Sequence, residues 1–489
     1  MRRSKFFQPR SIFVLILVSA TLAVAAHAQT FSTIATLSPG TGENPRTPLV
    51  QGLDGNLYGT AGLYGVYGGG TFIQVIPSGT SATVNNLYSF CFNDNTGCPD
   101  GAAPYGSIAL GPDGNFYGTT LGSFTGGEYS TVYKMTTAGA ETVLHTFCDA
   151  TGCPDGAYAS FAGLTLARNG DFYGVSNPPD GSSAYNNVVY KISSAGHLTV
   201  LLTVCPDTIC PADAGPTGTF LQASGGNLIS PGPGGATGFG AIYQMTPSGT
   251  PTVLYSSCED SVCHDGEGTQ APLAQAPGGN FYGTNNYGGA GANCTLSQGC
   301  GTAFRVTSTG GGVLTKLHDF CAWTSCADGG DPSALIQATD GNFYGVATDG
   351  GTSHKGTVFS LTPAGHFTLL HTLNGTTDGS GPVAALVQAT DGNLYGTTNT
   401  TVFKISLGLA PFVRTVQEAG AVGAPVTILG NNLTGASSVT FNGISATFTV
   451  VSNTEITTIV PAGATTGTIQ VVTASSSTLS SNVAFVVLP

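Results

Sequence analysis

Twelve cysteines are the side chains of this sequence with the clearest chemistry, because they form six pairs whose members lie five to seven residues apart. The pairs are Cys91 with Cys98, Cys148 with Cys153, Cys205 with Cys210, Cys258 with Cys263, Cys294 with Cys300 and Cys321 with Cys326. Such spacing is typical of local disulfides in exported proteins. The alternative is zinc, which needs four thiolate or imidazole ligands at one point. Each pair lies alone in its own stretch, and only Cys258, Cys263 and His264 come near three ligands, so we predict six local disulfides.

An aspartate recurs shortly after the cysteines. The copies are Asp100, Asp155, Asp213, Asp265 and Asp328, with Asp378 in a stretch that lacks cysteines. A ring of such carboxylates could bind Ca²⁺ or a polyol. The alternative interpretation is that Asp-Gly forms a turn before the next strand, which every copy needs. We favour the turn and keep Asp100, Asp155, Asp265 and Asp328 as candidate ligand-binding residues.

Aromatic residues in glycine-rich stretches are the other candidates for ligand binding. They are Tyr64, Tyr67, Phe124, Tyr129, Tyr185 and Tyr287, which could stack on sugars or pack against their own loops. The sequence contains no G-x-S-x-G, H-E-x-x-H, P-loop or EF-hand motif. We therefore predict no catalytic residue and no cofactor, and leave the binding of Ca²⁺ open.

The elements that position these residues are seven copies of a motif seen most clearly as Asp340-Gly-Asn-Phe-Tyr-Gly345. The copies begin at Asp54, Asp113, Asn169, Gly225, Gly278, Asp340 and Asp391, so the period is 51 to 62 residues. A full copy predicts four strands, at 334–339, 342–347, 357–362 and 367–373, joined by tight turns at Asp-Gly and Pro-x-Gly. Tandem four-stranded units of this kind are typical of a β-propeller.

The two ends of the repeat array indicate how it closes. The seventh copy lacks a fourth strand, whereas residues 31–37 match 367–373 and can supply it. We therefore predict a seven-bladed propeller in which the N-terminal strand completes the last blade. The loops between the second and third strands and those between blades are long and hold every cysteine pair, so we expect one plain face and one loop-rich face, where binding sites usually lie.

Composition and the chain ends define the remaining segments. Residues 1–28 have a basic start, an apolar run and Ala26-His27-Ala28, which predicts a signal peptide and export to the periplasm, cell surface or medium. The remainder carries 26 acidic residues against nine basic ones, which argues against nucleic acid as a partner, and no later stretch could span a bilayer. We expect a propeller at 29–408, a small β-sandwich at 409–489 and a monomer.

The motif copies, with Thr401-Val-Phe-Lys404 and Leu144-His-Thr-Phe147, resemble the GloVer (Gloeo-Verruco) repeat of exported bacterial proteins over residues 30–407. Val426-Thr-Ile-Leu-Gly-Asn-Asn-Leu433 and Val439-Thr-Phe-Asn-Gly443 resemble an IPT/TIG domain, an Ig-like module. The first resemblance implies a cell-envelope or secreted protein and the second a spacer or adhesive role; neither implies a catalytic residue.

Three functional hypotheses follow. The favoured one is a binding protein whose loop-rich face takes a carbohydrate or an envelope protein. The second is a carbohydrate-active enzyme or lyase that uses the acidic loop residues. The third is a purely structural component of the envelope.

Overall fold

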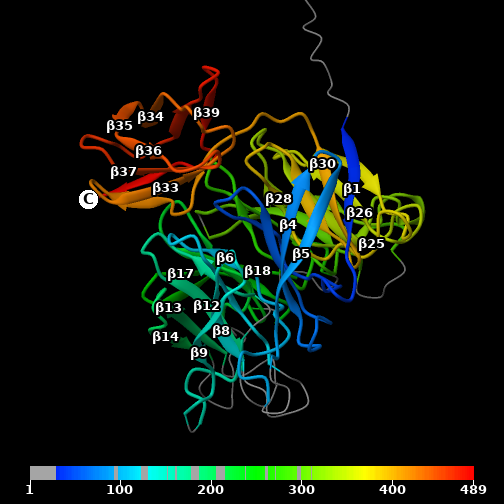
Figure 1. The fold of residues 1–489 in the computed structure, drawn as a ribbon. Helices are drawn as coiled ribbons and strands as arrows, with labels where there is room; N and C mark the ends of the chain where they lie inside the picture. The colour runs from blue at the N-terminus through cyan, green and yellow to red at the C-terminus, as the bar shows by residue number, and fades with distance from the viewer. Residues whose placement is uncertain are drawn as a thin grey trace, which may run out of the picture.

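The computed structural model describes residues 29–92, 97–122, 130–150, 152–159, 162–177, 187–204, 215–236, 238–258, 263–269, 271–294, 299–309 and 311–489. The expected signal peptide and Asp213 lie outside these ranges, as do Cys205 and Cys210. The described chain is almost entirely β-structure, with a single 3-10 turn at Thr324–Cys326 (Figure 1). Within the described ranges, no helix is long and apolar enough to cross a membrane.

The described residues between 30 and 406 form seven antiparallel sheets. Sheet 1 contains β2 (Val50–Gln51), β3 (Leu57–Ala61), β4 (Thr71–Ser78) and β5 (Ser81–Ser89). Sheet 2 contains β6 (Ala109–Leu110), β7 (Phe116–Thr119), β8 (Thr131–Met135) and β9 (Glu141–Thr146). Sheet 3 contains β10 (Tyr158–Ala159), β11 (Thr165–Leu166), β12 (Phe172–Asn177), β13 (Val188–Ile192) and β14 (Leu198–Thr203). Sheet 4 contains β15 (Leu221–Gln222), β16 (Leu228–Gly232), β17 (Ala241–Met245) and β18 (Pro251–Ser256).

The remaining sheets continue the same order. Sheet 5 contains β19 (Ala274–Gln275), β20 (Phe281–Asn285), β21 (Thr302–Val306) and β22 (Leu314–Asp319). Sheet 6 contains β23 (Gly330–Pro332), β24 (Ile336–Gln337), β25 (Phe343–Asp349), β26 (Thr357–Leu361) and β27 (Phe367–Thr372). Sheet 7 contains β28 (Val387–Gln388), β29 (Leu394–Thr397), β30 (Thr401–Ser406) and β1 (Thr30–Thr36).

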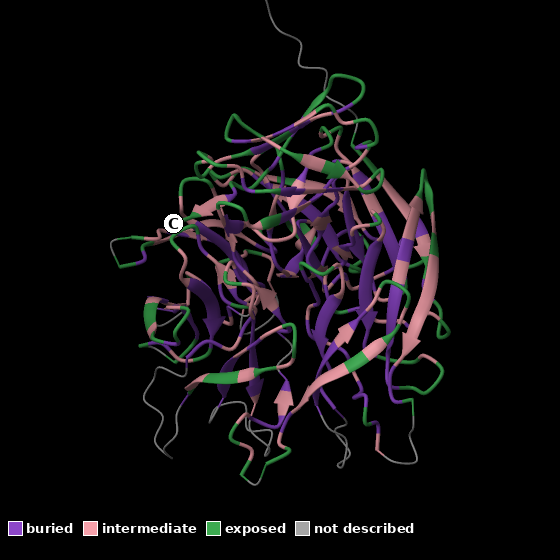
Figure 2. Ribbon diagram, turned by 60° about the vertical axis from the view of Figure 1, so that its left-hand side comes forward, coloured by how far each residue is buried: buried purple, intermediate pink, exposed green. Residues whose placement is uncertain are grey.

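The first strand of the described chain closes the last sheet, as the sequence match predicts. β1 pairs antiparallel with β30, from Thr30 opposite Ser406 to Thr36 opposite Thr401. Seven hydrophobic clusters then join each sheet to the next. One of them brings Ile34 of the closing strand, and Leu37 directly after it, against Leu57 and Ile73 of sheet 1. The sheets therefore form a closed ring, the propeller arrangement, with buried inner strands and partly exposed outer strands (Figure 2).

The repeated motif is a self-contained turn. Asp340 accepts hydrogen bonds from the backbone and side chain of Asn342, at 3.1 and 2.8 Å, and from the Tyr344 hydroxyl at 2.8 Å. Gly341 supplies the left-handed conformation that the turn requires, with φ at 82°. The motif thus satisfies the Tyr344 hydroxyl while its ring is buried, which explains why the Asp, Asn and Tyr recur together.

The final residues of the motif pack the sheets against each other. A motif tyrosine packs on the next sheet, where it meets an aromatic ring in some copies; Tyr282, for example, stacks on Phe343 with ring centroids 4.0 Å apart. A side chain on Gly345 would lie 2.7 Å from the Phe359 ring, so only glycine fits there. Adjacent aromatic residues in one strand are therefore both buried, because a neighbouring sheet covers each face.

The fourth copy departs from the motif yet forms the same sheet. It lacks the aspartate, and Ile229 and Ser230 replace the tyrosine and glycine. Ile229 is buried in the cluster between sheets 4 and 5, and the Ser230 hydroxyl donates to the Gly218 carbonyl at 2.8 Å. An apolar residue needs no hydroxyl partner, so the loss of the aspartate leaves no polar group unsatisfied.

A small sandwich follows the ring. Its strands are β31 (Arg414–Thr415), β32 (Ala419–Ala421), β33 (Pro425–Leu429), β34 (Ser438–Phe441), β35 (Ile444–Ala446), β36 (Phe448–Val450), β37 (Glu455–Ile459), β38 (Ile469–Val472), β39 (Thr478–Ser480) and β40 (Val486–Leu488). Two four-stranded sheets enclose a core in which Phe441 and Phe485 meet edge to face. β32 and β40 pair in parallel beside them.

The sandwich contacts the short turns of the propeller. Arg414 donates to the Gln51 carbonyl at 2.9 Å, and the Thr454 hydroxyl donates to the Leu53 carbonyl at 2.7 Å. A further contact joins Arg168 to Glu418, at 3.9 Å. Burial lowers the pKa of Arg414 to about 10, and the charge of Glu418 opposes this shift. The sandwich is thus attached to the plain face of the ring, and it lies at the upper left in Figure 1.

Candidate ligand-binding site

A cavity of about 730 Å³ lies at the centre of the ring, on the side of the long loops. Its wall includes a residue two or three positions before the first inner strand of every sheet. These residues are Pro48, Ser107, Ala162, Thr219, Pro272, Ala334 and Ala385. Because all seven sheets contribute, the cavity lies on the axis of the ring, and we call it the axial cavity.

Two exposed aromatic side chains line one side of the axial cavity. Phe239, in the β16–β17 connection, is 52% exposed, and Tyr287, in the β20–β21 connection, is 40% exposed. Gly268 lies between them, because its backbone N–H donates to the Phe239 carbonyl at 3.2 Å. A side chain on Gly268 would lie 3.2 Å from the Tyr287 ring. Both aromatic residues therefore lie beside Gly268 and line the axial cavity.

Hydrogen-bonding groups occupy other parts of the wall. Asn286 donates to Asp331 at 2.8 Å, and burial and the nearby Asp349 raise the pKa of Asp331 while Asn286 lowers it. Asn187 is buried, and its Oδ1 has no hydrogen-bond partner among the described residues. This oxygen is also shielded from the solvent in the cavity, so it carries a desolvation cost and is out of reach of a ligand unless the side chain moves.

The charges of the wall are few. Arg46 lies with its guanidinium carbon 5.6 Å from the centre of the Tyr105 ring, and Glu267 and Asp331 are the acidic residues of the wall. A second cavity of about 440 Å³ shares Arg46 with the first and is also lined by Tyr64. The two cavities therefore form neighbouring parts of the loop-rich face.

The candidate aromatic residues have different environments. Tyr287 lines the axial cavity, Tyr64 lines the second cavity, and Tyr67 packs edge to face on Phe92 with ring centroids 5.6 Å apart. Phe124, Tyr129 and Tyr185 lie outside the described residues. Phe239 was not among the residues predicted from the sequence, although it lies in a glycine-rich connection between second and third strands, the same signal that selects Tyr287. Arg46, Asn187 and Asp331 of the cavity wall were also not predicted.

The candidate aspartates bind within their own loops. Asp155 accepts from His145 at 2.7 Å and from the Cys148 backbone at 3.2 Å, and Asp265 accepts from Tyr255 and the Cys258 backbone. Asp100 bonds to Tyr88 at 2.8 Å and to the backbone of Phe92, and Asp328 bonds to His318 at 3.1 Å and to the backbone of Ala322. Each carboxylate therefore joins the outermost strand of one sheet to the loop that leads to the next, which is the role expected of a turn residue.

A partly buried acidic residue lies close to Asp100. Burial, and then the charge of Asp100, raise the pKa of Glu141 from 4.5 to about 7. The unfolded chain loses this proton near pH 4.5 and the folded chain near pH 7, so the folded state binds more protons in between. Stability should thus fall as pH rises from about 4.5 to about 7 and stay lowered above it.

We expect Glu141→Gln to remove this loss of stability. The variant should match the parent in urea unfolding near pH 4.5 and be more stable at pH 8, because glutamine carries no charge into the partly buried position. Asp149→Ala, at an exposed position, is the matched control. A variant that is equally or less stable than the parent at pH 8 would show that Glu141 does not titrate as described.

Five of the six predicted cysteine pairs form disulfides in the structure. They are Cys91–Cys98, Cys148–Cys153, Cys258–Cys263, Cys294–Cys300 and Cys321–Cys326. The sixth pair joins Cys205 to Cys210 in the sequence analysis. Because Cys205 and Cys210 both lie outside the described residues, the structure does not test this disulfide. The bond between Cys205 and Cys210 therefore stays a prediction from the sequence.

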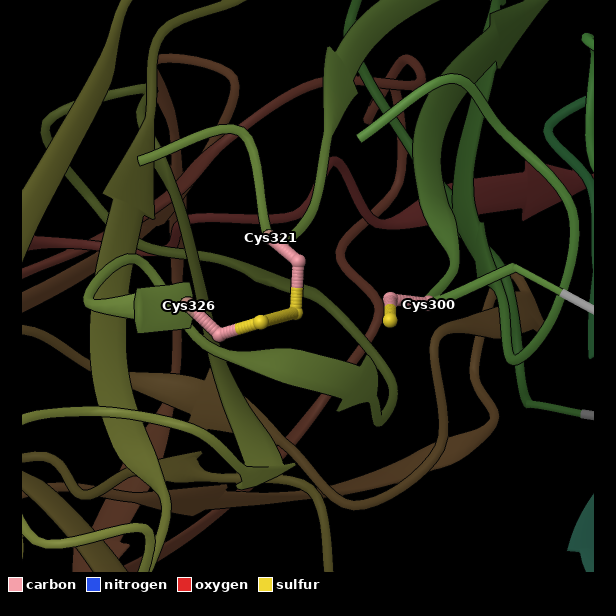
Figure 3. A group of neighbouring side chains, drawn as sticks. All are labelled: Cys300, Cys321 and Cys326. Carbon is pink, nitrogen blue, oxygen red and sulfur yellow. A yellow bond between two sulfur atoms is a disulfide. The ribbon is translucent and has the colours of Figure 1, made fainter. Parts of the chain in front are cut away.

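The expectation that every cysteine pair lies alone is wrong for two of the five disulfides. The Sγ atoms of Cys300, Cys321 and Cys326 lie within 4.8 Å of one another (Figure 3). The β20–β21 connection, within sheet 5, and the β22–β23 connection, which leaves this sheet, meet here. Because these cysteines are bonded in pairs, they are not free to act as zinc ligands.

This architecture defines an all-β protein in which a closed ring of four-stranded sheets carries a C-terminal sandwich. The chain belongs to the Gloeobacter/Verrucomicrobia repeat family, whose pattern matches residues 21–184 and 160–408. Residues 411–487 match the IPT/TIG domain. The repeat family and the Ig-like domain together indicate an interaction module.

No curated protein matched the sequence. Among solved structures, a fungal alcohol oxidase of the AA5 family in complex with copper is 14% identical, with 94% of this chain and 99% of that chain covered and a TM-score of 0.49. A Bacteroides thetaiotaomicron protein of unknown function is 12% identical, covering 78% and 76%, with a TM-score of 0.39. Puromycin hydrolase is 14% identical, covering 76% and 57%, with a TM-score of 0.45. Likenesses at this level carry no inference about activity.

Proposed function

We propose that this protein is an exported binding protein that holds a neutral carbohydrate in the axial cavity. The observation that carries the proposal is the pair of exposed aromatic side chains, Phe239 and Tyr287, on the cavity wall. Ligand-binding cavities are commonly lined by aromatic side chains, which a bound ligand covers. A sugar ring has an apolar face that can stack on them and hydroxyls that reach the surrounding polar groups.

The polar groups of the wall favour a neutral ligand rich in hydroxyls. Asn286 supplies a side-chain amide, and Asp331 supplies carboxylate oxygens. The wall contains one arginine and two acidic residues, so the site has no excess of positive charge to attract an anion. The net negative charge of the whole chain also disfavours an anionic ligand.

The position of the sandwich supports binding from the loop-rich face. The sandwich contacts Gln51, Leu53 and Arg168 at the short turns, and thus leaves the long loops free of domain contacts in the described residues. The disulfides lie in those loops, where they limit loop motion and reduce the entropy lost when a ligand binds. The cysteine pairs also support export, because such bonds persist in oxidising compartments.

The test is a glycan screen followed by calorimetry with the best ligand. Phe239→Ala and Tyr287→Ala should each weaken binding by roughly tenfold or more, because truncating an aromatic anchor at a binding site commonly removes at least about 1.4 kcal/mol. Tyr67→Ala is the matched control, since Tyr67 is similarly exposed but packs on Phe92 and does not line the axial cavity. A glycan that binds all three variants with the parental affinity would contradict the proposal, as would selective binding of anionic ligands or proteins alone.

A further inference from the structure

Two disulfides meet at one corner of the fifth sheet. Cys294–Cys300 lies in the β20–β21 connection, and Cys321–Cys326 lies in the β22–β23 connection. Figure 3 shows the Cys300 sulfur beside the Cys321–Cys326 bond, and the three Sγ atoms lie within 4.8 Å of one another. In the part of the chain that the structure describes, no other three cysteines come together in this way.

The two loops are fixed against each other by their backbones. The Asn293 N–H donates to the Cys321 carbonyl at 2.9 Å, and the Asn293 side chain donates to the Ala322 carbonyl at 3.0 Å. Gly330 lies beside both disulfides, because a Cβ atom there would be 3.3 Å from the Cys321 sulfur and 3.7 Å from Cys300 Cβ. The sulfurs are thus held near each other by the fold and not only by the two disulfides.

We propose that these four cysteines form one thiol–disulfide exchange cluster. A dithiol reductant opens Cys321–Cys326, is itself oxidised to a disulfide, and leaves two thiols. One of them, as its thiolate, attacks Cys300 Sγ, so that a new bond forms to Cys300 while the Cys294–Cys300 bond breaks. Cys294 leaves as a thiolate and takes up the proton that the attacking thiol lost. The second step is neutral in electrons, and the attack of a thiolate on a neighbouring disulfide is the ordinary route of such exchange.

The exchanged bond would join the two loops covalently beside the axial cavity. The Cys300 carbonyl accepts a hydrogen bond from the Asp331 N–H at 3.0 Å, and Asp331 is part of the cavity wall. The redox state of the cluster therefore acts on the position of Asp331. Its effect on ligand affinity rests on the proposed function, whereas the exchange itself does not.

The test uses Cys294→Ala in the full chain, purified without reductant and labelled with an alkylating agent under denaturing acid quench. If the cluster exchanges, the one unpaired thiol is shared, and Cys321 or Cys326 should carry at least roughly a tenth of the label, because pairings within tenfold in stability coexist. Cys91→Ala is the matched control, in which only Cys98 should be labelled. Label on Cys300 alone would overturn the proposal.

A second measurement on the unaltered chain keeps the proposal testable if the variant folds poorly. Limited reduction, alkylation and digestion should give a peptide that joins Cys300 to Cys321 or Cys326. The Cys148–Cys153 pair should open without any crossed peptide. Recovery of native pairs and fully reduced peptides only would contradict the exchange cluster. Neither experiment needs a ligand, so failure here is distinct from failure of carbohydrate binding.

Discussion

Replacing Ile34 with alanine should lower the free energy of unfolding by about 2–5 kcal/mol, the usual cost of truncating a buried isoleucine. Ile34 is 5% exposed and lies in the cluster where the closing strand β1 meets sheet 1. The residue therefore contributes to ring closure, although it lies only a few residues from the start of the described chain. Urea unfolding followed by far-ultraviolet circular dichroism measures the change.

The matched control for ring closure is Thr36→Ala, because Thr36 lies on the same strand but is exposed. This variant should stay within about 0.5 kcal/mol of the parent. Equal stability of the Ile34→Ala variant and the parent would show that β1 does not hold the ring closed in solution.

The second large effect is expected at a candidate ligand residue. Asp328→Ala should cost about 3–5 kcal/mol, because it removes the acceptor of three hydrogen bonds at a fully buried position, and each group left unsatisfied costs roughly 1–3 kcal/mol. The Asp328 carboxylate is fully buried and accepts hydrogen bonds from His318 and from the backbone of Ala322 and Trp323. Its loss leaves these donors without an acceptor. Thermal or urea unfolding measures the effect, with the exposed Asp149→Ala as control.

The same experiment separates the two interpretations of the aspartate series. If Asp328 is a turn residue, the loss of stability should be the same with and without EDTA. If the carboxylates bind Ca²⁺, chelation should destabilise the parent protein and reduce the difference between parent and variant. A marked effect of EDTA would thus contradict the structural role assigned to Asp328.

The sequence predicted those features of the fold that depend on local chemistry. The Asp340 turn and the buried pair Phe343 and Tyr344 are recognisable because the copies fill the same space between sheets and four of them repeat the Asp–Tyr hydrogen bond. The closing strand is recognisable because it repeats the sequence of an outer strand. The fourth copy shows the limit of this reasoning. Its sequence departs from the motif, yet Ile229 preserves the packing without needing the aspartate.

The candidate site was predicted less completely, since its residues come from loops that are distant in the sequence. Arg46, Asn187 and Asp331 approach each other only when the ring closes, and no spacing rule relates them. The convergence of Cys300 with Cys321 and Cys326 has the same cause, because two loops of one sheet end at the same face. Phe239 is different, since the rule that selected Tyr287 applies to it equally well.

The central claim is that the axial cavity binds a carbohydrate through its aromatic wall. The most direct measurement is a crystal structure of the protein with the best neutral glycan from the screen. We expect a sugar ring to lie in contact with Phe239 and Tyr287, roughly 4 Å from their carbon atoms, the normal distance for apolar contact. The claim would be contradicted by a glycan that binds on the sandwich, on the plain face or against the outer strands while the axial cavity holds no sugar.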